Sequence, residues 1–577
     1  MRLHTISEVF FFSSLLSLGS ALPAADKAGA PSAKALYDKV VGVIGGQSTL
    51  DALTGYSFHA PSFRSTTLTQ NYELAHSDQS VAEAGSQNVS FSFANNMLQQ
   101  RIDRTYQFGA YWIWAFPELN PDMDFSVVVH SGANSTACFN KGRNSFYAFG
   151  TVKALGYADP LLTNYLVHSA EQLALPYLLQ QFSKRTSKLV AGSTTDKILG
   201  MKFSTLYDPE LDLSLLINDA TSLPYAVRAK ETHKIFGPSN SDIVFSNFTQ
   251  VPFRGNSSIQ LPHRMQTVYN EAFVLEDFTV DKYTLNPTVE ANFFAAAPPA
   301  DAESPMYMGP ATESKDETVS SDIHEFYEAG LWGGVFEQRF NVSHVVAQPV
   351  FQNGSTKIQA LFVGYPDYVQ LLVELDDALI ITDAPAHRSN IVIEWIAQNM
   401  KGKKVTHVVP SHHHRDHAGG VNDYLAAGAT LVIPEVAKHF YENINGGHFK
   451  AHTYSKDKPF VLEDKHTRFE SFWHEDSSHA RDWTYATAYP KCQGDKDFVV
   501  YNVDVVNPGP GAALRTDIAH AREFLLSAIA DGIPKTATLV GSHGSTAHGL
   551  GTQESLEYVA DLAGMVYPDI QARQHKC

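Results

Sequence analysis

The residues best suited to chemistry lie in one short stretch of the C-terminal half. His412, His414, Asp416 and His417 have the spacing H-x-H-x-D-H, after a short apolar run and before two glycines. Imidazole and carboxylate groups are ligands that zinc and neighbouring divalent metals accept. Adjacent histidines also occur in expression tags and low-complexity tracts, but such tracts lack the aspartate and the flanking apolar run. The stretch therefore predicts a metal site at the end of a buried strand, and His413 is expected to point away from its neighbours.

Further polar residues stand at the ends of other apolar runs. Asp504 ends F-V-V-Y-N-V-D, His543 ends T-L-V-G-S-H, and His479 stands just before the run that leads to Pro490. Side chains at strand ends can project into one shared cleft. Asp383 ends L-I-I-T-D, and we expect it to support the ligands rather than to bind metal.

The elements that position these residues alternate between strand and helix from about residue 325, which is typical of an α/β layered domain. Strands are predicted at 358–363, 369–375, 378–382, 405–410, 429–433, 483–490 and 498–505, and helices at 390–399, 421–426, 517–530 and 554–562.

The order I-T-D-A, H-H-H-R-D-H-A-G-G, His479, V-D-V-V and S-H-G resembles the metallo-β-lactamase-fold hydrolase superfamily. The resemblance covers roughly residues 325–577 and implies an αβ/βα sandwich with a dinuclear metal site at one edge. The family pattern favours His479 over His474 as a ligand. The ligand set that it implies is His412, His414 and His479 on one zinc ion, Asp416, His417 and His543 on a second, and Asp504 as the bridge.

The resemblance also implies a reaction. Two zinc ions would activate a bridging hydroxide that attacks an ester, lactone, thioester or amide, while Asp416 orients the nucleophile or accepts a proton. Antibiotic-degrading members with a zinc-bound cysteine do not place an aspartate at the position of Asp504. That bridge is more similar to the lactonase, thioesterase, phosphodiesterase and alkylsulfatase branches, and redox members would place an acid at His414. Two alternatives stay open: a sulfatase or phosphodiesterase on the same centre, and a protein that binds a hydrophobic ligand.

The first 295 residues hold no ligand cluster and are predicted to form a β-rich α+β domain. A helix is expected over 36–44, ending at Gly45-Gly46, and a second helical region over 160–182. Strands are predicted at 97–108, 111–116, 125–130, 213–217, 225–230, 243–251 and 264–274. The order of these elements, with L-P-Y-A-V-R and L-P-H-R-M, resembles bacterial lipoprotein-carrier domains.

The length of 577 residues favours two domains joined by a linker. The Pro-, Ala-, Ser- and acid-rich segment 296–324 is the expected linker, between domains at 26–295 and 325–577. The net charge of −18 disfavours a nucleic-acid substrate, because phosphate binding relies on basic patches. A small-molecule substrate is expected, and its cleft is expected to be lined from the segments 434–458 and 507–515. No pattern indicates the substrate's identity or an oligomeric state.

Residues 1–25 are predicted to be a secretory signal peptide, with an apolar core over Val9–Leu18 that is too short to span a membrane. Asn-x-Ser/Thr sequons agree with a secreted, extracellular glycoprotein, and they lie at Asn88, Asn134, Asn247, Asn256, Asn341 and Asn353. No integral membrane association is expected. Three cysteines, Cys138, Cys492 and Cys577, allow at most one disulfide.

Overall fold

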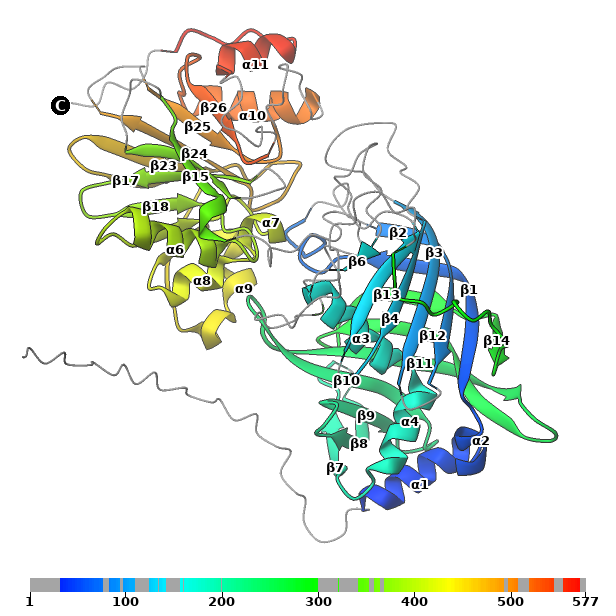
Figure 1. Ribbon diagram of the computed structural model, residues 1–577. Coiled ribbons are helices and arrows are strands. Elements are labelled where there is room, and N and C mark those ends of the chain that lie inside the picture. The colour runs from blue at the N-terminus through cyan, green and yellow to red at the C-terminus, as the bar shows by residue number, and fades with distance from the viewer. Residues whose placement is uncertain are drawn as a thin grey trace, which may run out of the picture.

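The computed structural model describes two units, one up to residue 298 and one from residue 341 (Figure 1). The described residues are 32–75, 82–93, 97–108, 124–132, 134–141, 156–158, 160–198, 200–298, 320, 341–351, 357–363, 368–491, 497–506, 518–543 and 554–570. The predicted signal peptide and most of the predicted linker fall outside these residues, so both stay predictions.

One antiparallel sheet of 14 strands forms most of the N-terminal unit. Its order is β6-β5-β4-β3-β2-β1-β13-β12-β11-β10-β9-β8-β7, with β14 paired to β1. Successive side chains of a strand point to opposite faces of the sheet, so the two faces pack into separate cores. In β10, Val227 and Ala229 lie in the main core, whereas Ala226 lies in a smaller cluster. The strands are β1 (Gly55–Thr66), β2 (Ala82–Ser92), β3 (Gln99–Phe108), β4 (Phe125–His130), β5 (Thr136–Lys141), β6 (Gly156–Tyr157), β7 (Val190–Thr195), β8 (Lys202–Asp208), β9 (Leu213–Asn218), β10 (Pro224–His233), β11 (Gly237–Pro252), β12 (Ser258–Tyr269), β13 (Phe273–Thr279) and β14 (Lys282–Leu285).

Four helices pack against this sheet: α1 (Ala33–Ile44), α2 (Gln47–Asp51), α3 (Pro160–Leu173) and α4 (Leu175–Lys184). The Ser32 hydroxyl caps α1 by accepting the Ala35 N–H. The helix ends as predicted at Gly45, whose φ is 141°. A Cβ at Gly45 would lie 2.5 Å from the carbonyl oxygen of Ser258 in β12, so only glycine permits this close approach.

The predicted helical region 160–182 is two helices rather than one. Ala174 separates them with a ψ of 61°, and Pro176 lies in the first turn of α4. A proline is tolerated there because the first N–H groups of a helix have no partner within the helix.

The predicted strand 264–274 was wrong as a single element. It spans the turn between β12 and β13, where Asn270 and Glu271 have positive φ values of 50° and 63°. The Asn270 amide oxygen accepts the Asn240 N–H, which fixes the turn. The predicted strand 111–116 lies outside the described residues.

Two sheets build the C-terminal unit. The seven-stranded sheet has the order β15-β16-β17-β18-β19-β20-β21, and the five-stranded sheet has the order β22-β23-β24-β25-β26. Strands β18 to β21 are parallel to one another, as are β25 and β26. The first sheet contains β15 (Val345–Pro349), β16 (Ile358–Val363), β17 (Val369–Glu374), β18 (Leu379–Thr382), β19 (His407–Val409), β20 (Thr430–Pro434) and β21 (Lys450–Tyr454); the second contains β22 (Phe460–Glu463), β23 (Thr467–Trp473), β24 (Thr484–Pro490), β25 (Val499–Asn502) and β26 (Thr538–Gly541).

Alternating side chains of these strands separate three cores. In β17, Leu371 joins a cluster shared by both sheets, whereas Leu372 joins a cluster with helices of the first sheet. Val500 of β25 joins a third cluster, with helices of the second sheet. The helices are α6 (Ser389–Asn399), α7 (Arg415–Ala418), α8 (Val421–Ala426), α9 (Lys438–Tyr441), α10 (Ile518–Ala530) and α11 (Leu556–Leu562). The order of layers is therefore helix, sheet, sheet, helix, which is the predicted αβ/βα sandwich (Figure 1).

The two units share a packed interface. Leu74, after β1, and Ile235, in the β10–β11 hairpin, lie in the same apolar cluster as the helices of the first sheet. The hairpin reaches α9 (Figure 1), where the Phe236 and Phe440 ring centroids are 5.5 Å apart. The Arg481 N–H also donates to the Leu74 carbonyl at 2.8 Å.

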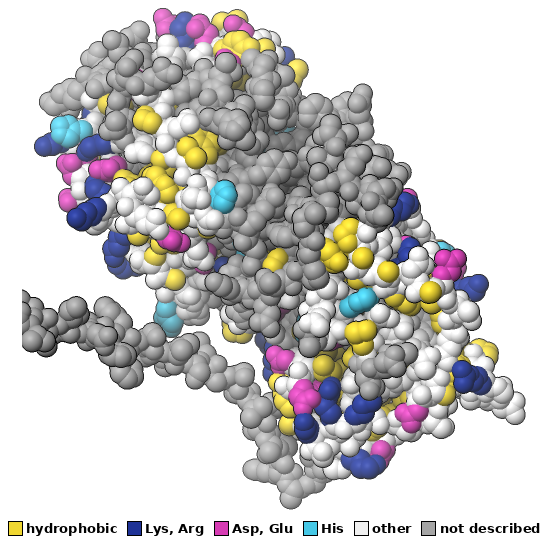
Figure 2. All heavy atoms as spheres, in the orientation of Figure 1, with side chains coloured by type: hydrophobic (Ala, Val, Ile, Leu, Met, Phe, Trp, Pro, Cys, Tyr) yellow, Lys and Arg dark blue, Asp and Glu magenta, His cyan; other side chains and the backbone are white. Residues whose placement is uncertain are grey.

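On the face drawn in Figure 2, the described Lys and Arg side chains are interspersed with Asp and Glu. Across the described ranges, no helix is both long and apolar enough to cross a membrane.

Candidate metal centre

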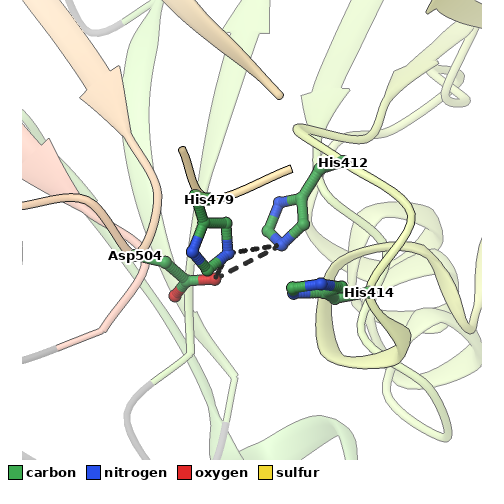
Figure 3. Close-up of side chains that lie close together, drawn as sticks. All are labelled: His412, His414, His479 and Asp504. Carbon is green, nitrogen blue, oxygen red and sulfur yellow. Dashed lines mark hydrogen bonds and ion pairs between the residues drawn. The ribbon is translucent and has the colours of Figure 1, made fainter. Parts of the chain in front are cut away.

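Four buried side chains converge where the two sheets of the C-terminal unit meet (Figure 3). His412 and His414 come from the loop after β19, whereas His479 and Asp504 come from loops that join elements of the second sheet. The Nε2 atoms of His412 and His479 are 3.1 Å apart, and they lie 3.4 and 3.2 Å from Asp504 Oδ2. One ligand atom from each of the four lies within 4.8 Å of the others.

A second group lies beside the first and shares Asp504 with it. Its other members are Asp416, His417 and His543. His417 Nε2 lies 3.0 Å from both Asp416 Oδ2 and Asp504 Oδ2. His543 Nε2 lies 3.3 Å from Asp416 Oδ2 and 3.1 Å from Asp504 Oδ1. The structure thus brings together all seven predicted ligands, with Asp504 facing both groups.

These separations fit metal coordination. Ligands at about 2.0–2.1 Å from a tetrahedral zinc ion are about 3.3 Å from one another. The closest donor pairs in both groups lie 3.0 to 3.4 Å apart. All seven side chains are buried, and His414 Nε2 has no hydrogen-bond partner among the residues that the structure describes. The two groups therefore have the donor types, spacing and burial that two divalent ions need.

The loop that carries the first four ligands is held close to the end of β18. The Ala384 N–H donates to the His417 carbonyl, and the Gly420 N–H donates to the Ala384 carbonyl, both at 2.7 Å. A Cβ at Gly420 would lie 2.1 Å from Ser389 Oγ and 2.6 Å from the Pro385 carbonyl oxygen. The Gly-Gly pair after the histidines is required because the two segments touch there.

The shared aspartate has an unusual backbone. Asp504 has a φ of 63°, and the Val505 N–H donates to the Val503 carbonyl across it at 2.7 Å. This hydrogen bond and positive φ describe a γ-turn of the rare, strained kind. The turn comes directly after β25 and aims the carboxylate at both groups.

Asp383 supports His417, as predicted from its position. Its Oδ2 lies 3.0 Å from His417 Nδ1, so the ring can donate from Nδ1 and keep the Nε2 lone pair free. Its Oδ1 accepts the Ser411 N–H at 2.7 Å. The Tyr501 hydroxyl lies 2.7 Å from Asp383 Oδ2 and 2.8 Å from the Val369 carbonyl oxygen.

Sequence reasoning missed Tyr501. It lies two residues before the turn of Asp504, in a strand whose four residues are all buried. The available signal was the hydroxyl itself, because a buried tyrosine usually finds a hydrogen-bond partner.

Other predicted residues have different surroundings. His413 turns away from both groups, as expected, and its Nδ1 lies 2.7 Å from Asp482 Oδ1. His474 contacts Ser527 and Glu523 rather than the centre. In segment 434–458, which is expected to line the substrate cleft, the ring of Phe440 is fully buried between the two units. Tyr441 and Tyr454 are also buried, and segment 507–515 lies outside the described residues.

Burial and neighbouring charges shift the pKa values of the proposed ligands. Burial, and then the neighbouring His414, His417 and His479, lower the pKa of His412 well below its ordinary value. His412 is therefore neutral near pH 7, which is the form that binds metal. Burial opposes ionisation of Asp504, but His417 and His543 outweigh it and hold the pKa of that carboxyl well below its usual range.

No protein-family model matches the sequence, and a search of curated proteins found no match. A metallo-β-lactamase from Pontibacter korlensis is similar, with 19% identity, 38% of this chain and 99% of that chain covered, and a TM-score of 0.29. A metallo-β-lactamase from Hirschia baltica is 14% identical, over 39% of this chain and 99% of that chain, with a TM-score of 0.28. A flavo-diiron protein from Thermotoga maritima is 14% identical, over 35% of this chain and 56% of that chain, with a TM-score of 0.27.

Proposed function

We propose that the chain is a dinuclear zinc hydrolase that cleaves an ester, lactone, thioester or amide. The observation that carries the proposal is the carboxylate of Asp504, which faces both ligand groups from a strained turn. A carboxylate in that position can hold two metal ions at the short separation that two-metal hydrolysis uses.

Each residue of the centre has a proposed role. His412, His414 and His479 would hold one ion, Asp416, His417 and His543 the other, and Asp504 both. When bound, two zinc ions lower the pKa of water and polarise the group that is attacked. The protein keeps His417 in one ring orientation through Asp383, so that Nε2 faces the centre.

Asp416 is the proposed proton acceptor. Burial opposes its ionisation, but His417, and hydrogen bonds from His417 and His543, outweigh burial and hold the pKa of Asp416 below its ordinary value. Oδ2 lies close to both histidines, and the lowered pKa keeps the carboxylate ionised near neutral pH. An ionised Asp416 can hold the nucleophile in place or accept its proton.

Metal analysis and a substrate panel test the proposal. The purified chain should hold about two zinc ions, and a chelator should remove hydrolysis of carboxylic esters and lactones. His414→Ala should lower the zinc content, and it should lower the rate of hydrolysis by about a hundred-fold or more. His474→Ala is the matched control, because His474 is near in sequence but bonds Ser527 and Glu523 instead.

Full activity of the His414→Ala variant would exclude this mechanism. The same panel should include an alkyl sulfate and a bis-aryl phosphodiester. Faster turnover of either would assign the centre to the alternative sulfatase or phosphodiesterase chemistry.

We also propose that the protein is secreted and glycosylated. The five sequon asparagines among the described residues are all exposed, which supports this: Asn88, Asn134, Asn247, Asn256 and Asn341. Mass spectrometry of the protein from a eukaryotic culture medium, with and without glycosidase, tests both parts. Recovery of unglycosylated protein only inside cells would contradict them.

A further inference from the structure

A cavity of about 420 Å³ lies in the N-terminal unit, between α3 and strands β10 to β13. None of its lining residues belongs to the metal centre. Small-molecule pockets span about 300–1,000 Å³, so this cavity is large enough for a small organic ligand.

The wall of the cavity is apolar on the sheet side. Ile243 of β11, Leu275 of β13 and Ala229 of β10 line it and are buried. Helix α3 adds the ring of Tyr165 and the side chain of Val167. A hydrocarbon group placed here would be removed from water on several sides.

Two carboxylates face the same cavity from opposite elements. Glu231, on β10, is satisfied, since it accepts the N–H and the hydroxyl of Ser320 at 2.8 and 3.0 Å. Glu171, on α3, makes no hydrogen bond and no close ion pair with any residue that the structure describes. Burial raises the pKa of Glu171 to about 7. Glu171 is only partly exposed, and the charge of Arg185 lowers its pKa without outweighing the effect of burial. A cation in the cavity would therefore stabilise the carboxylate further.

The cavity lining itself offers Glu171 little positive charge, since Arg185 is not among the lining residues. Lys230 lines the cavity but is exposed. Burial lowers the pKa of His168, so that ring is neutral near pH 7. Asp212, which also lines the cavity, adds a third acid at an exposed position. The lining therefore favours a cation over an anion.

We propose that this cavity binds a small amphipathic amine, whose ammonium group is held by Glu171 and whose hydrocarbon part lies against Ile243 and Leu275. The site is separate from the proposed hydrolytic centre and does not depend on it.

Calorimetric titration of the full chain with hexylammonium, hexanol and hexanoate tests the proposal, since the three probes differ only in the head group. Hexylammonium should bind about ten-fold or more tightly than hexanol, and hexanoate should bind more weakly than both. Equal binding of hexylammonium and hexanol, or tighter binding of hexanoate, would overturn the proposal.

Variants locate the site. Glu171→Gln keeps the shape of the side chain, and it should weaken hexylammonium binding about ten-fold without lowering the melting temperature. Glu290→Gln, at an exposed position of the same unit, should bind hexylammonium as the unaltered chain does. Amines can also bind zinc, so the His414→Ala variant serves as a second control. It should bind hexylammonium as the unaltered chain does if the amine binds in the cavity. Loss of binding in His414→Ala, or unchanged binding in Glu171→Gln, would refute the cavity site.

Discussion

At the scale of single residues, the centre depends on groups that hold the ligands as much as on the ligands. The Asp383 carboxylate accepts hydrogen bonds from the His417 ring, the Ser411 N–H and the Tyr501 hydroxyl. One carboxylate therefore holds both the ligand loop and β25. Burial raises the pKa of Tyr501 well above its ordinary value, so its hydroxyl keeps its proton near neutral pH. Tyr501 is therefore a donor to Asp383 at the pH at which the centre would work.

Removing that hydroxyl tests the support of His417. Tyr501→Phe should lower hydrolysis by about ten-fold, because a lost outer hydrogen bond typically costs 10–100-fold in metal affinity or activity. Steady-state rates and zinc titrations on the purified variant measure the effect. Tyr485→Phe is the matched control, since that buried hydroxyl also contacts a carboxylate, that of Asp531, which belongs to neither ligand group. Equal losses in the two variants would show that Tyr501 acts only on stability.

The sequence predicted the ligands better than their supports. His412, His414, Asp416 and His417 share one short motif, and their spacing is visible without a structure. Tyr501 has no such signal, because its contact with Asp383 joins residues 118 positions apart in sequence. Only the packing of the two sheets against each other brings such residues together.

At the scale of elements, the strand and helix predictions of the C-terminal unit were close. Strand 358–363 and helix 421–426 have the predicted bounds. Alternation predicts buried strands well, but it does not reveal a turn between two alternating segments, so the single strand predicted over 264–274 misses the turn at Asn270 and Glu271. The short β19 (His407–Val409) was predicted too long, since the chain leaves the sheet before the ligand loop begins.

The contact between the ligand loop and the end of β18 gives a prediction at this scale. Gly420→Ala should lower the melting temperature of the C-terminal unit by several degrees and reduce hydrolysis, because a new Cβ overlaps Ser389 and the Pro385 carbonyl. Overpacking of this kind costs about 1–3 kcal/mol. Gly42→Ala, in the exposed middle of α1, meets nothing within 4 Å and should instead stabilise the N-terminal unit by about 0.5–1 kcal/mol. Calorimetric melting of both variants distinguishes the two effects, and an unchanged Gly420→Ala transition would show that the loop is not tightly held.

At the scale of the whole molecule, the N-terminal unit contacts the support of the metal centre. Phe440 lies at the junction, with ring centroids 5.0 Å from Tyr72, 5.5 Å from Phe236 and 5.5 Å from His413. His413 lies between two metal ligands in sequence and is paired with Asp482. The length of the chain predicted two domains, but it gives no sign of this contact, which joins loops of the N-terminal unit to α9.

Truncating one side of this junction tests whether the N-terminal unit supports the centre. Phe236→Ala should lower stability by about 2 kcal/mol or more, less than the 3–5 kcal/mol of a fully buried phenylalanine because Phe236 is only partly buried. It should also reduce hydrolysis several-fold, since Phe440, whose ring contacts His413, loses a neighbour. Phe253→Ala is the matched control: it removes a partly buried ring of the same unit, at the far end of β11, without touching α9. Thermal melting and steady-state rates should show that both variants lose stability while only Phe236→Ala loses activity. Normal rates in Phe236→Ala would mean that the C-terminal unit holds its centre without help from the N-terminal unit.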